Sequence, residues 1–335
     1  MDLIQLIKRL SDADGVNGLG GASTLAAEIL SQFGEVETDS MGGITAFIKG
    51  KSDQTVMLDA HIDEIGLIVT DIDGDFLRVA ACGGVDKRVL TAQEVTVHGK
   101  KDLFGVFCSV PPHIKKDKSD APDIADMAID TGLKHDELSA IVSPGDRVSF
   151  RQSAAELIGG RLTGKSLDNR AGCAAVIAAV QMLCDNAIPQ ENIIVSLSAQ
   201  EEIGLRGAKT ATFRNTPHEA IVVDVSFGKF DGIANHKTGK LGGGPMIGIS
   251  PITDREITER IKVIANACSI PVQYEVIGGS TGTNADVISV TKSGVKTALI
   301  SIPLLSMHTP PEVIDTSDVE MTARLIARYI GKVKA

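Results

Sequence analysis

The chain has no tryptophan and only two tyrosines among its 335 residues. Aromatic rings are the platforms on which proteins stack nucleobases and sugar rings, so their scarcity argues against single-stranded nucleic acid and carbohydrate as ligands. Excess positive charge is also absent, because the formal net charge is −10 at pH 7 and the pI is near 5.2. Nucleic-acid binding requires a basic face. We therefore expect no nucleic-acid partner.

Cysteine is used sparingly, and no CxxC pair occurs. The five cysteines are scattered along the chain, at Cys82, Cys108, Cys173, Cys184 and Cys268. An odd, scattered set is typical of reduced cytosolic thiols and not of a disulfide framework or a thiolate zinc site. The chain also lacks the roughly 20 consecutive apolar residues that a membrane-spanning helix needs, and its N-terminus has no signal-peptide layout. We expect a cytoplasmic protein with no membrane partner.

Three catalytic signatures are missing as well. The sequence contains no G-x-S-x-G nucleophile elbow, no Walker loop and no H-E-x-x-H helix. Their absence disfavours serine hydrolases of that type, P-loop nucleotide hydrolases and zincins. Residues 18–21 superficially resemble a dinucleotide-binding loop. Because they do not follow a strand and lack the full glycine spacing, we predict a plain loop before a helix.

The order of periodic segments predicts an α/β fold with one insertion. Apolar residues at three- and four-residue spacing predict helices over 3–10 and 24–33, and two strands follow. From about residue 69 to 162, short β-rich pieces alternate with turn signals. Strands and helices then resume and end in a predicted helix over 317–333.

We therefore predict two domains. Residues 1–68 and 163–335 would form a discontinuous α/β domain with a mixed sheet. Residues 69–162 would form a small β-rich, barrel-like domain that is inserted into it.

Two imidazoles and several carboxylates follow short apolar runs. These runs are β-branched and end in polar or Gly/Pro residues, which is typical of buried strands. In an open α/β sheet, ligands gather outside the carboxyl ends of the strands. Imidazole and carboxylate groups that meet at such an edge are the ligand set of a hydrolytic metal site. The residues concerned are His61, Asp168, Glu201, Glu202, Asp224 and His308.

His61 and Asp168 each allow a second interpretation. His61 and Asp63 share a face of an extended segment, so Asp63 could fix the tautomer of a metal-bound imidazole. A histidine that is hydrogen-bonded for structural reasons is the alternative. Asp168 precedes a small-residue helix predicted over 171–183. It is either the N-cap of that helix or a carboxylate that bridges two metal ions.

The adjacent acids Glu201 and Glu202 are the most discriminating pair. Neighbouring residues of a regular strand point to opposite faces, so both can serve one site only where the strand ends. Gly204 and Gly207 supply that irregularity. Metal-assisted hydrolysis needs one carboxylate on the metal and one free as general base. A solvated strand cap is the alternative. Asp224 is flanked by apolar residues and needs a partner, of which a metal ion is one.

Five motifs occur in the order found in a known family. They are AHIDEIG at 60–66, PPH at 111–113, GKSLDNR at 164–170, QEEIGLRGA at 200–208 and HTP at 308–310. Through them the chain resembles the co-catalytic metallopeptidases that include the tetrahedral glutamyl, leucyl and lysyl aminopeptidases and the deblocking aminopeptidases of the cytosol. The resemblance extends from about Leu58 to the C-terminus.

The resemblance implies a ligand set for two divalent metal ions per subunit. One ion would be held by His61, Asp168 and Asp224. The other would be held by Asp168, Glu202 and His308, so that Asp168 is shared. Zinc or cobalt is expected, with manganese as the alternative, because nitrogen and oxygen ligands accept all three.

The resemblance further implies an aminopeptidase, which removes N-terminal residues from short peptides. Glu201 would take a proton from the attacking water and deliver it to the leaving amine. Asp63 would be the partner of His61 behind the metal. Residues 69–162 would be the dimerisation domain of a homo-oligomer, anywhere from a dimer to a dodecamer.

Two other functions stay open on the residues alone. A metal-dependent deacylase of N-acyl amino acids would use the same fold, and a non-catalytic scaffold subunit would only build an oligomer. An intact Glu201 argues against the scaffold. The substrate pocket offers no clear charge, since residues 304–307 lack Arg and Lys and Asn284 is neutral, although Asp286 lies nearby. We predict a preference for neutral, mainly apolar N-terminal residues.

Overall fold

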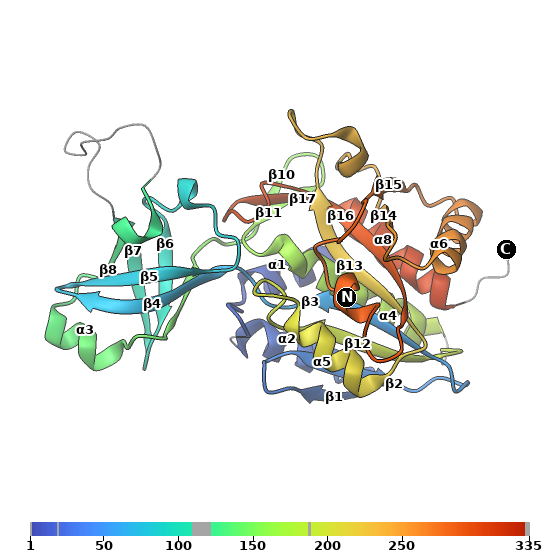
Figure 1. The fold of residues 1–335 in the computed structure, drawn as a ribbon, viewed down its shortest axis with the longest axis horizontal. Helices are drawn as coiled ribbons and strands as arrows, with labels where there is room; N and C mark the ends of the chain where they lie inside the picture. The colour runs from blue at the N-terminus through green and yellow to red at the C-terminus, as the bar shows by residue number, and fades with distance from the viewer. Residues whose placement is uncertain (1, 19, 109–121, 187–188, 332–335) are drawn as a thin grey trace.

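The computed structural model describes residues 2–18, 20–108, 122–186 and 189–331. The chain forms two bodies, a β-barrel and a larger α/β unit, which lie at the left and right of Figure 1. The motif expected at 111–113 lies outside the described residues.

The larger unit is built on one mixed sheet of eleven strands. Its four central strands are parallel neighbours, in the order β12 (Asn192–Ser198), β3 (Thr55–His61), β13 (Glu219–Phe227) and β16 (Lys296–Leu305). Every residue of β12 is buried, as expected for a parallel strand covered on both faces. The outer strands are β1 (Glu35–Thr38), β2 (Ile44–Ile48), β17 (Glu312–Asp315), β11 (Arg161–Gly164), β10 (Ala155–Leu157), β14 (Met246–Ile249) and β15 (Gln273–Val276).

Helices pack on both faces of this sheet (Figure 1). The larger core contains α1 (Leu3–Asp12), α2 (Gly20–Leu30), α4 (Leu167–Asn186), α6 (Arg255–Ala267) and α8 (Thr316–Ile330). The smaller core contains α5 (Arg206–Asn215) and α7 (Ala285–Ile288). Along β3, Val56 and Leu58 belong to the larger core and Met57 to the smaller one. This alternation is the two-residue period of a strand buried on both sides.

Aspartates fix the start of three helices by accepting otherwise unpaired backbone N–H groups. Asp2 accepts from the first turn of α1, Asp254 from that of α6, and Asp315 from that of α8. The helix predicted over 24–33 spans Gly20–Leu30 instead, so Gly20 and Gly21, which were predicted to lie in a plain loop, belong to its first turn. Within the described residues, none of the helices is both long and apolar enough to cross a membrane.

The second body is a closed barrel with its own hydrophobic core. Its strands, in order around the barrel, are β4 (Gly66–Asp73), β5 (Phe76–Cys82), β8 (Ala128–Asp130), β7 (Asp102–Cys108), β6 (Glu94–His98) and β9 (Arg147–Phe150). Closure pairs every strand on both sides and leaves no open edge. In the described part of the chain, the remaining helices of this body are α3 (His135–Ile141) and the 3₁₀ turns η1 (Lys87–Val89) and η2 (Ile124–Asp126). A further 3₁₀ turn, η3 (Asn235–Lys237), contacts β15 of the large sheet.

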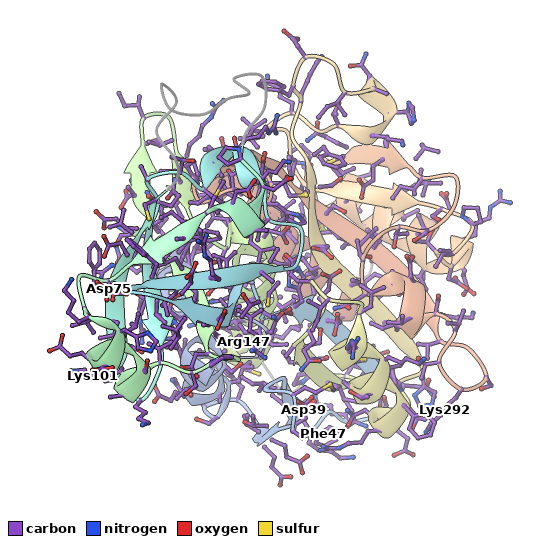
Figure 2. The ribbon with its side chains drawn as sticks, turned by 60° about the vertical axis from the view of Figure 1, so that its left-hand side comes forward. Asp39, Phe47, Asp75, Lys101, Arg147 and Lys292 are labelled. Atoms are coloured by element: carbon purple, nitrogen blue, oxygen red, sulfur yellow. The ribbon has the colours of Figure 1, made fainter. Side chains whose placement is uncertain are left out.

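The turn between β4 and β5 holds α3 against the barrel. The Asp75 carboxylate accepts hydrogen bonds from the His135 backbone N–H at 2.9 Å and from the Lys134 ammonium at 2.8 Å. Figure 2 shows Asp75 at this outer end of the barrel.

The predicted fold class is confirmed, since a mixed-sheet α/β unit carries an inserted β-barrel. The barrel strands lie between residues 66 and 150, whereas β10 and β11, at 155–157 and 161–164, pair with the large sheet. The division into domains at residues 69 and 162 stays a prediction.

Candidate metal centre

The candidate residues gather at the carboxyl ends of the four parallel strands. His61 is the last residue of β3, and Asp224 lies near the end of its neighbour β13. Glu201 and Glu202 follow the end of β12, and His308 follows the end of β16. Asp168 joins them from the start of α4, where it has non-helical backbone angles. The sheet edge thus collects side chains that are far apart in sequence.

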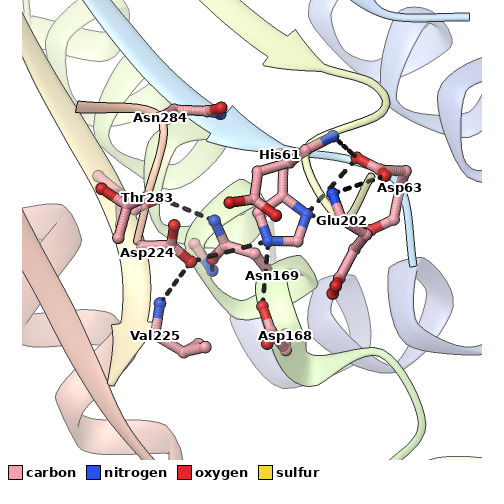
Figure 3. Close-up of polar contacts among 12 residues, drawn as sticks. His61, Asp63, Asp168, Asn169, Glu202, Asp224, Val225, Thr283 and Asn284 are labelled. Carbon is pink, nitrogen blue, oxygen red and sulfur yellow. Dashed lines mark hydrogen bonds and ion pairs between the residues drawn. The ribbon is translucent and has the colours of Figure 1, made fainter. Parts of the chain in front are cut away.

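Asp168 lies between the two imidazoles. Its Oδ1 is 3.0 Å from His61 Nε2, and its Oδ2 is 3.4 Å from His308 Nε2. Asp224 Oδ1 lies 3.7 Å from His61 Nε2, and Glu202 Oε2 lies 3.5 Å from His308 Nε2. Figure 3 shows Asp168 and Asp224 both turned toward the His61 ring. Each carboxylate oxygen of Asp168 therefore faces a different histidine.

Among the described residues, three groups of donor atoms are close enough to hold an ion, with all atoms of a group within 4.8 Å of one another. Two of them share Asp168, namely His61 with Asp168 and Asp224, and Asp168 with Glu202 and His308. The third contains His61, Glu201 and Glu202. Mixed imidazole and carboxylate donors suit divalent ions such as zinc, cobalt and manganese, so the residues present fit such ions.

Asp63 supports the site mainly through backbone groups. Its carboxylate accepts hydrogen bonds from the backbone N–H of Glu201 at 3.0 Å and of Glu202 at 3.3 Å. Its Oδ1 is 3.6 Å from His61 Nδ1, whereas its own carbonyl oxygen is closer to that nitrogen, at 3.2 Å. Since a carbonyl only accepts, His61 donates through Nδ1 and directs Nε2 at Asp168. Asp63 thus orders two parts of the site, the loop after β12 and the His61 ring (Figure 3).

Glu312 is a site residue that the sequence reasoning missed. Its side chain is 2% exposed. Its Oε2 accepts from the backbone N–H of Asp168, and its Oε1 from the backbone N–H of His308, both at 2.9 Å. One buried carboxylate therefore joins the two segments that carry Asp168 and His308. The only sequence signal is an acid four residues after His308, which by itself is unspecific.

The site contains more negative charge than its histidines balance. Burial raises the pKa of Glu201 to about 7, and it raises the pKa of Glu202 and of Asp224 well above the usual range, with further help from neighbouring carboxylates. For Asp168, burial is outweighed by the two imidazoles, which lower its pKa. Burial disfavours a charged His61, but the surrounding carboxylates raise its pKa nevertheless. A bound cation would offset this concentration of buried negative charge.

The cleft above these residues has a volume of about 550 Å³. Its walls are the end of β13, the segment 280–283 with Asp286, and the side chains of Leu205 and Met307 together with Gly84. No Lys or Arg is among the described residues that line it. The Asp286 carboxylate is occupied by the wall itself. It accepts from the backbone N–H groups of Thr281 at 2.8 Å and Gly282 at 3.1 Å, and from the hydroxyl groups of Ser280 and Thr281.

A second polar arrangement has the order of a serine hydrolase triad but lacks access. His98 Nε2 is 2.9 Å from Ser149 Oγ, and its Nδ1 is 2.9 Å from Asp102. Ser149 is fully buried, so no substrate carbonyl can reach its hydroxyl group. We interpret the arrangement as structural.

A family model described as M42 glutamyl aminopeptidase matches residues 42–325. The chain belongs to this family. The M42 chain is 32% identical to the lysyl aminopeptidase of Pyrococcus furiosus over 98% of its own length and 97% of that protein. The predicted family and enzyme class are confirmed, and the chain is a peptidase that hydrolyses N-terminal residues from peptides.

Solved structures agree with this assignment. Aminopeptidase APDkam598 from the archaeon Desulfurococcus kamchatkensis has a TM-score of 0.92 and 32% identity, over 99% of the M42 chain and 95% of that chain. The Pyrococcus horikoshii TET1 peptidase has a TM-score of 0.88 and 28% identity, over 99% of the M42 chain and 100% of that chain. It is described as able to assemble into a tetrahedron or a large octahedral shell.

Proposed function

We propose that this M42 aminopeptidase works with two divalent metal ions. His61, Asp168 and Asp224 would hold one ion, and Asp168, Glu202 and His308 the other. The observation that carries the proposal is Asp168, whose two oxygens lie 3.0 and 3.4 Å from two different imidazoles. A carboxylate so placed suits the bridging position of a two-metal site. Zinc or cobalt is proposed, with manganese as the alternative.

When bound, the ions would polarise the scissile carbonyl and lower the pKa of the attacking water. Two acids of the described pocket lining, Glu201 and Asp286, belong to neither set that shares Asp168. Asp286 is occupied by hydrogen bonds from its own wall, which leaves Glu201. We assign it the proton transfer from water to the leaving amine. Asp63 holds Glu201 in place through the Glu201 backbone N–H, at 3.0 Å. The general base thus has a fixed backbone and a side chain that lines the cleft.

The cleft supports a preference for neutral, mainly apolar N-terminal residues. The side-chain carboxylate of an N-terminal glutamate would find no Lys or Arg among the described lining residues. The side-chain ammonium of an N-terminal lysine would have to compete for Asp286 with the four hydrogen bonds that this carboxylate accepts from residues 280–282. Burying either charge without a free partner is unfavourable. Leu205, Val225, Phe227 and Met307 supply apolar lining.

We propose further that the chain acts as a cytoplasmic homo-oligomer in which the barrel, within residues 69–162, provides a dimer contact. The barrel has its own closed hydrophobic core, and it supplies none of the proposed metal ligands. The shell-forming TET1 peptidase spans the same length with the same fold. A closed shell would admit short peptides and exclude folded proteins.

The test of the two-metal proposal combines metal analysis with substrate choice. The protein as purified would be assayed for bound divalent ions, dialysed against a chelator, and reconstituted with zinc, cobalt or manganese. We expect about two ions per chain, loss of aminopeptidase activity on chelation, and recovery on reconstitution. Substrates with a free amine should be cleaved and their N-acylated counterparts should not. Full activity in chelator, with no ion bound, would contradict the proposal.

A further inference from the structure

We propose that Gly84, in the loop that leaves the barrel after β5, is a positioning residue for His308 and makes the barrel a structural part of the metal centre. The inference rests on the proposed ligand role of His308. Gly84 lies between β5 and η1 of the barrel, whereas His308 follows β16 of the large sheet. The two residues are 224 positions apart in the chain.

The contact fixes the tautomer of the imidazole. His308 Nδ1 lies 3.1 Å from the carbonyl oxygen of Gly84. Because a carbonyl oxygen only accepts, Nδ1 carries the proton and donates it. In the neutral ring, Nε2 then keeps the lone pair that a metal ion needs, and it lies 3.4 Å from Asp168 Oδ2 and 3.5 Å from Glu202 Oε2. Metal-binding histidines are oriented in this way, with the second nitrogen donating to a carbonyl or carboxylate.

The same position leaves no room for a side chain. A Cβ atom added to Gly84 would lie 2.5 Å from His308 Nδ1 and 2.9 Å from its Cε1. Such distances are shorter than van der Waals contact, so the ring would have to move. Gly84 is not among the residues with positive φ, and alanine is therefore compatible with its backbone. The effect of a methyl group at this position would pass through the His308 ring and not through backbone strain.

The neighbouring glycine approaches another proposed ligand of the same ion. A Cβ atom on Gly83 would lie 3.2 Å from Glu202 Oε2. His308 needs such support, because it lies on a loop, has a φ of 62°, and has a side chain that is 32% exposed. A movement of the barrel relative to the sheet would withdraw the Gly84 carbonyl from His308. The barrel and the second metal position are therefore mechanically coupled.

The test compares Gly84→Ala with Gly278→Ala. Gly278 has nothing within 4 Å of an added Cβ and no positive φ, so it reports the general effect of the substitution. Metal-free protein would be titrated with Co²⁺, with calorimetry and cobalt absorption as readouts, and its thermal unfolding measured in parallel. We expect Gly84→Ala to bind one of the two ions about 10–100-fold more weakly and to retain the other. Normal affinity for both ions would overturn the inference.

A double-mutant cycle with His308→Ala separates this inference from the proposed ligand set. His308→Ala should weaken the binding of the same ion. Adding Gly84→Ala should then change neither the metal affinity nor the thermal unfolding temperature further, since the ring is gone. If His308→Ala keeps both ions, the ligand set itself is wrong. If it loses one ion while Gly84→Ala binds normally, only the present inference fails. A loss of thermal stability on Gly84→Ala that is equally large with His308 and with His308→Ala would also overturn it, because the effect would then not pass through the His308 ring.

Discussion

Glu312→Gln is the substitution whose effect follows most directly from the structure. The Glu312 carboxylate accepts one hydrogen bond on each oxygen, from the backbone N–H groups of Asp168 and His308, both at 2.9 Å. Glutamine has nearly the same shape but only one acceptor oxygen. Its amide nitrogen would face one of the two N–H groups, and two donors would then meet in a buried position.

The magnitude follows from the burial of these groups. Glu312 is 2% exposed and Asp168 is 7% exposed, so water does not readily replace the lost acceptor. An unsatisfied buried N–H costs about 1–3 kcal/mol, and we expect the free energy of unfolding to fall by an amount in that range. Because Asp168 belongs to both proposed ligand sets, both ions should bind more weakly, by about 10–100-fold. Gly84→Ala, by contrast, should weaken the binding of only one ion, the one proposed to be held by His308.

The assay is chemical denaturation of the metal-free protein together with metal titration. The matched control is Glu320→Gln, an exposed acid on α8. The control should leave both the unfolding free energy and the metal affinities unchanged. If Glu312→Gln behaves like this control in both measurements, the hydrogen bonds of Glu312 do not organise the site and the reasoning is refuted.

Three further predictions concern the reaction and the assembly. Glu201→Gln should retain metal binding but lower kcat by about two to four orders of magnitude; near-normal turnover would move the general base elsewhere. In a competition between leucyl, glutamyl and lysyl substrates the leucyl substrate should be cleaved fastest, and a clear preference for either charged substrate would mean that other residues recognise the side chain. Light scattering should give a mass of at least two chains, and a mass of 35.2 kDa at working concentration would contradict the proposed assembly.

The residues at the strand ends could be predicted because each lies next to its own signal. His61 directly ends an apolar run, and Asp224 interrupts one, so the sequence itself indicates that both are buried beside a strand terminus. The parallel pairing of β3 and β13 then brings the two side chains to one edge. Local sequence and one topological rule were sufficient for these positions.

Glu312 and Gly84 could not be predicted in this way, because their roles depend on tertiary contacts. Glu312 is the first residue of the short strand β17, and nothing local shows that its two oxygens accept from Asp168 and His308. Gly84 belongs to a different body of the fold from the ring it contacts. Glycines are frequent in this chain, with 34 in total, so a glycine in a loop carries little information alone. The supporting groups of a site are therefore harder to predict than its ligands.

The supporting carboxylates also explain how the ligand-bearing loops keep unfavourable backbone conformations. Gln200 and Leu205 flank the acid pair with φ values of 62° and 58°, and Ser306 and His308 have values of 60° and 62°. Non-glycine residues adopt such angles only where the surroundings hold them there. Asp63 holds the first loop by two backbone N–H groups, and Glu312 holds the second by one. Loss of either acid would let its loop relax toward ordinary angles, which recovers part of the stability but moves the ligands apart. The loss of unfolding free energy on Glu312→Gln should therefore lie in the lower part of the range of about 1–3 kcal/mol, whereas metal affinity has no such compensation.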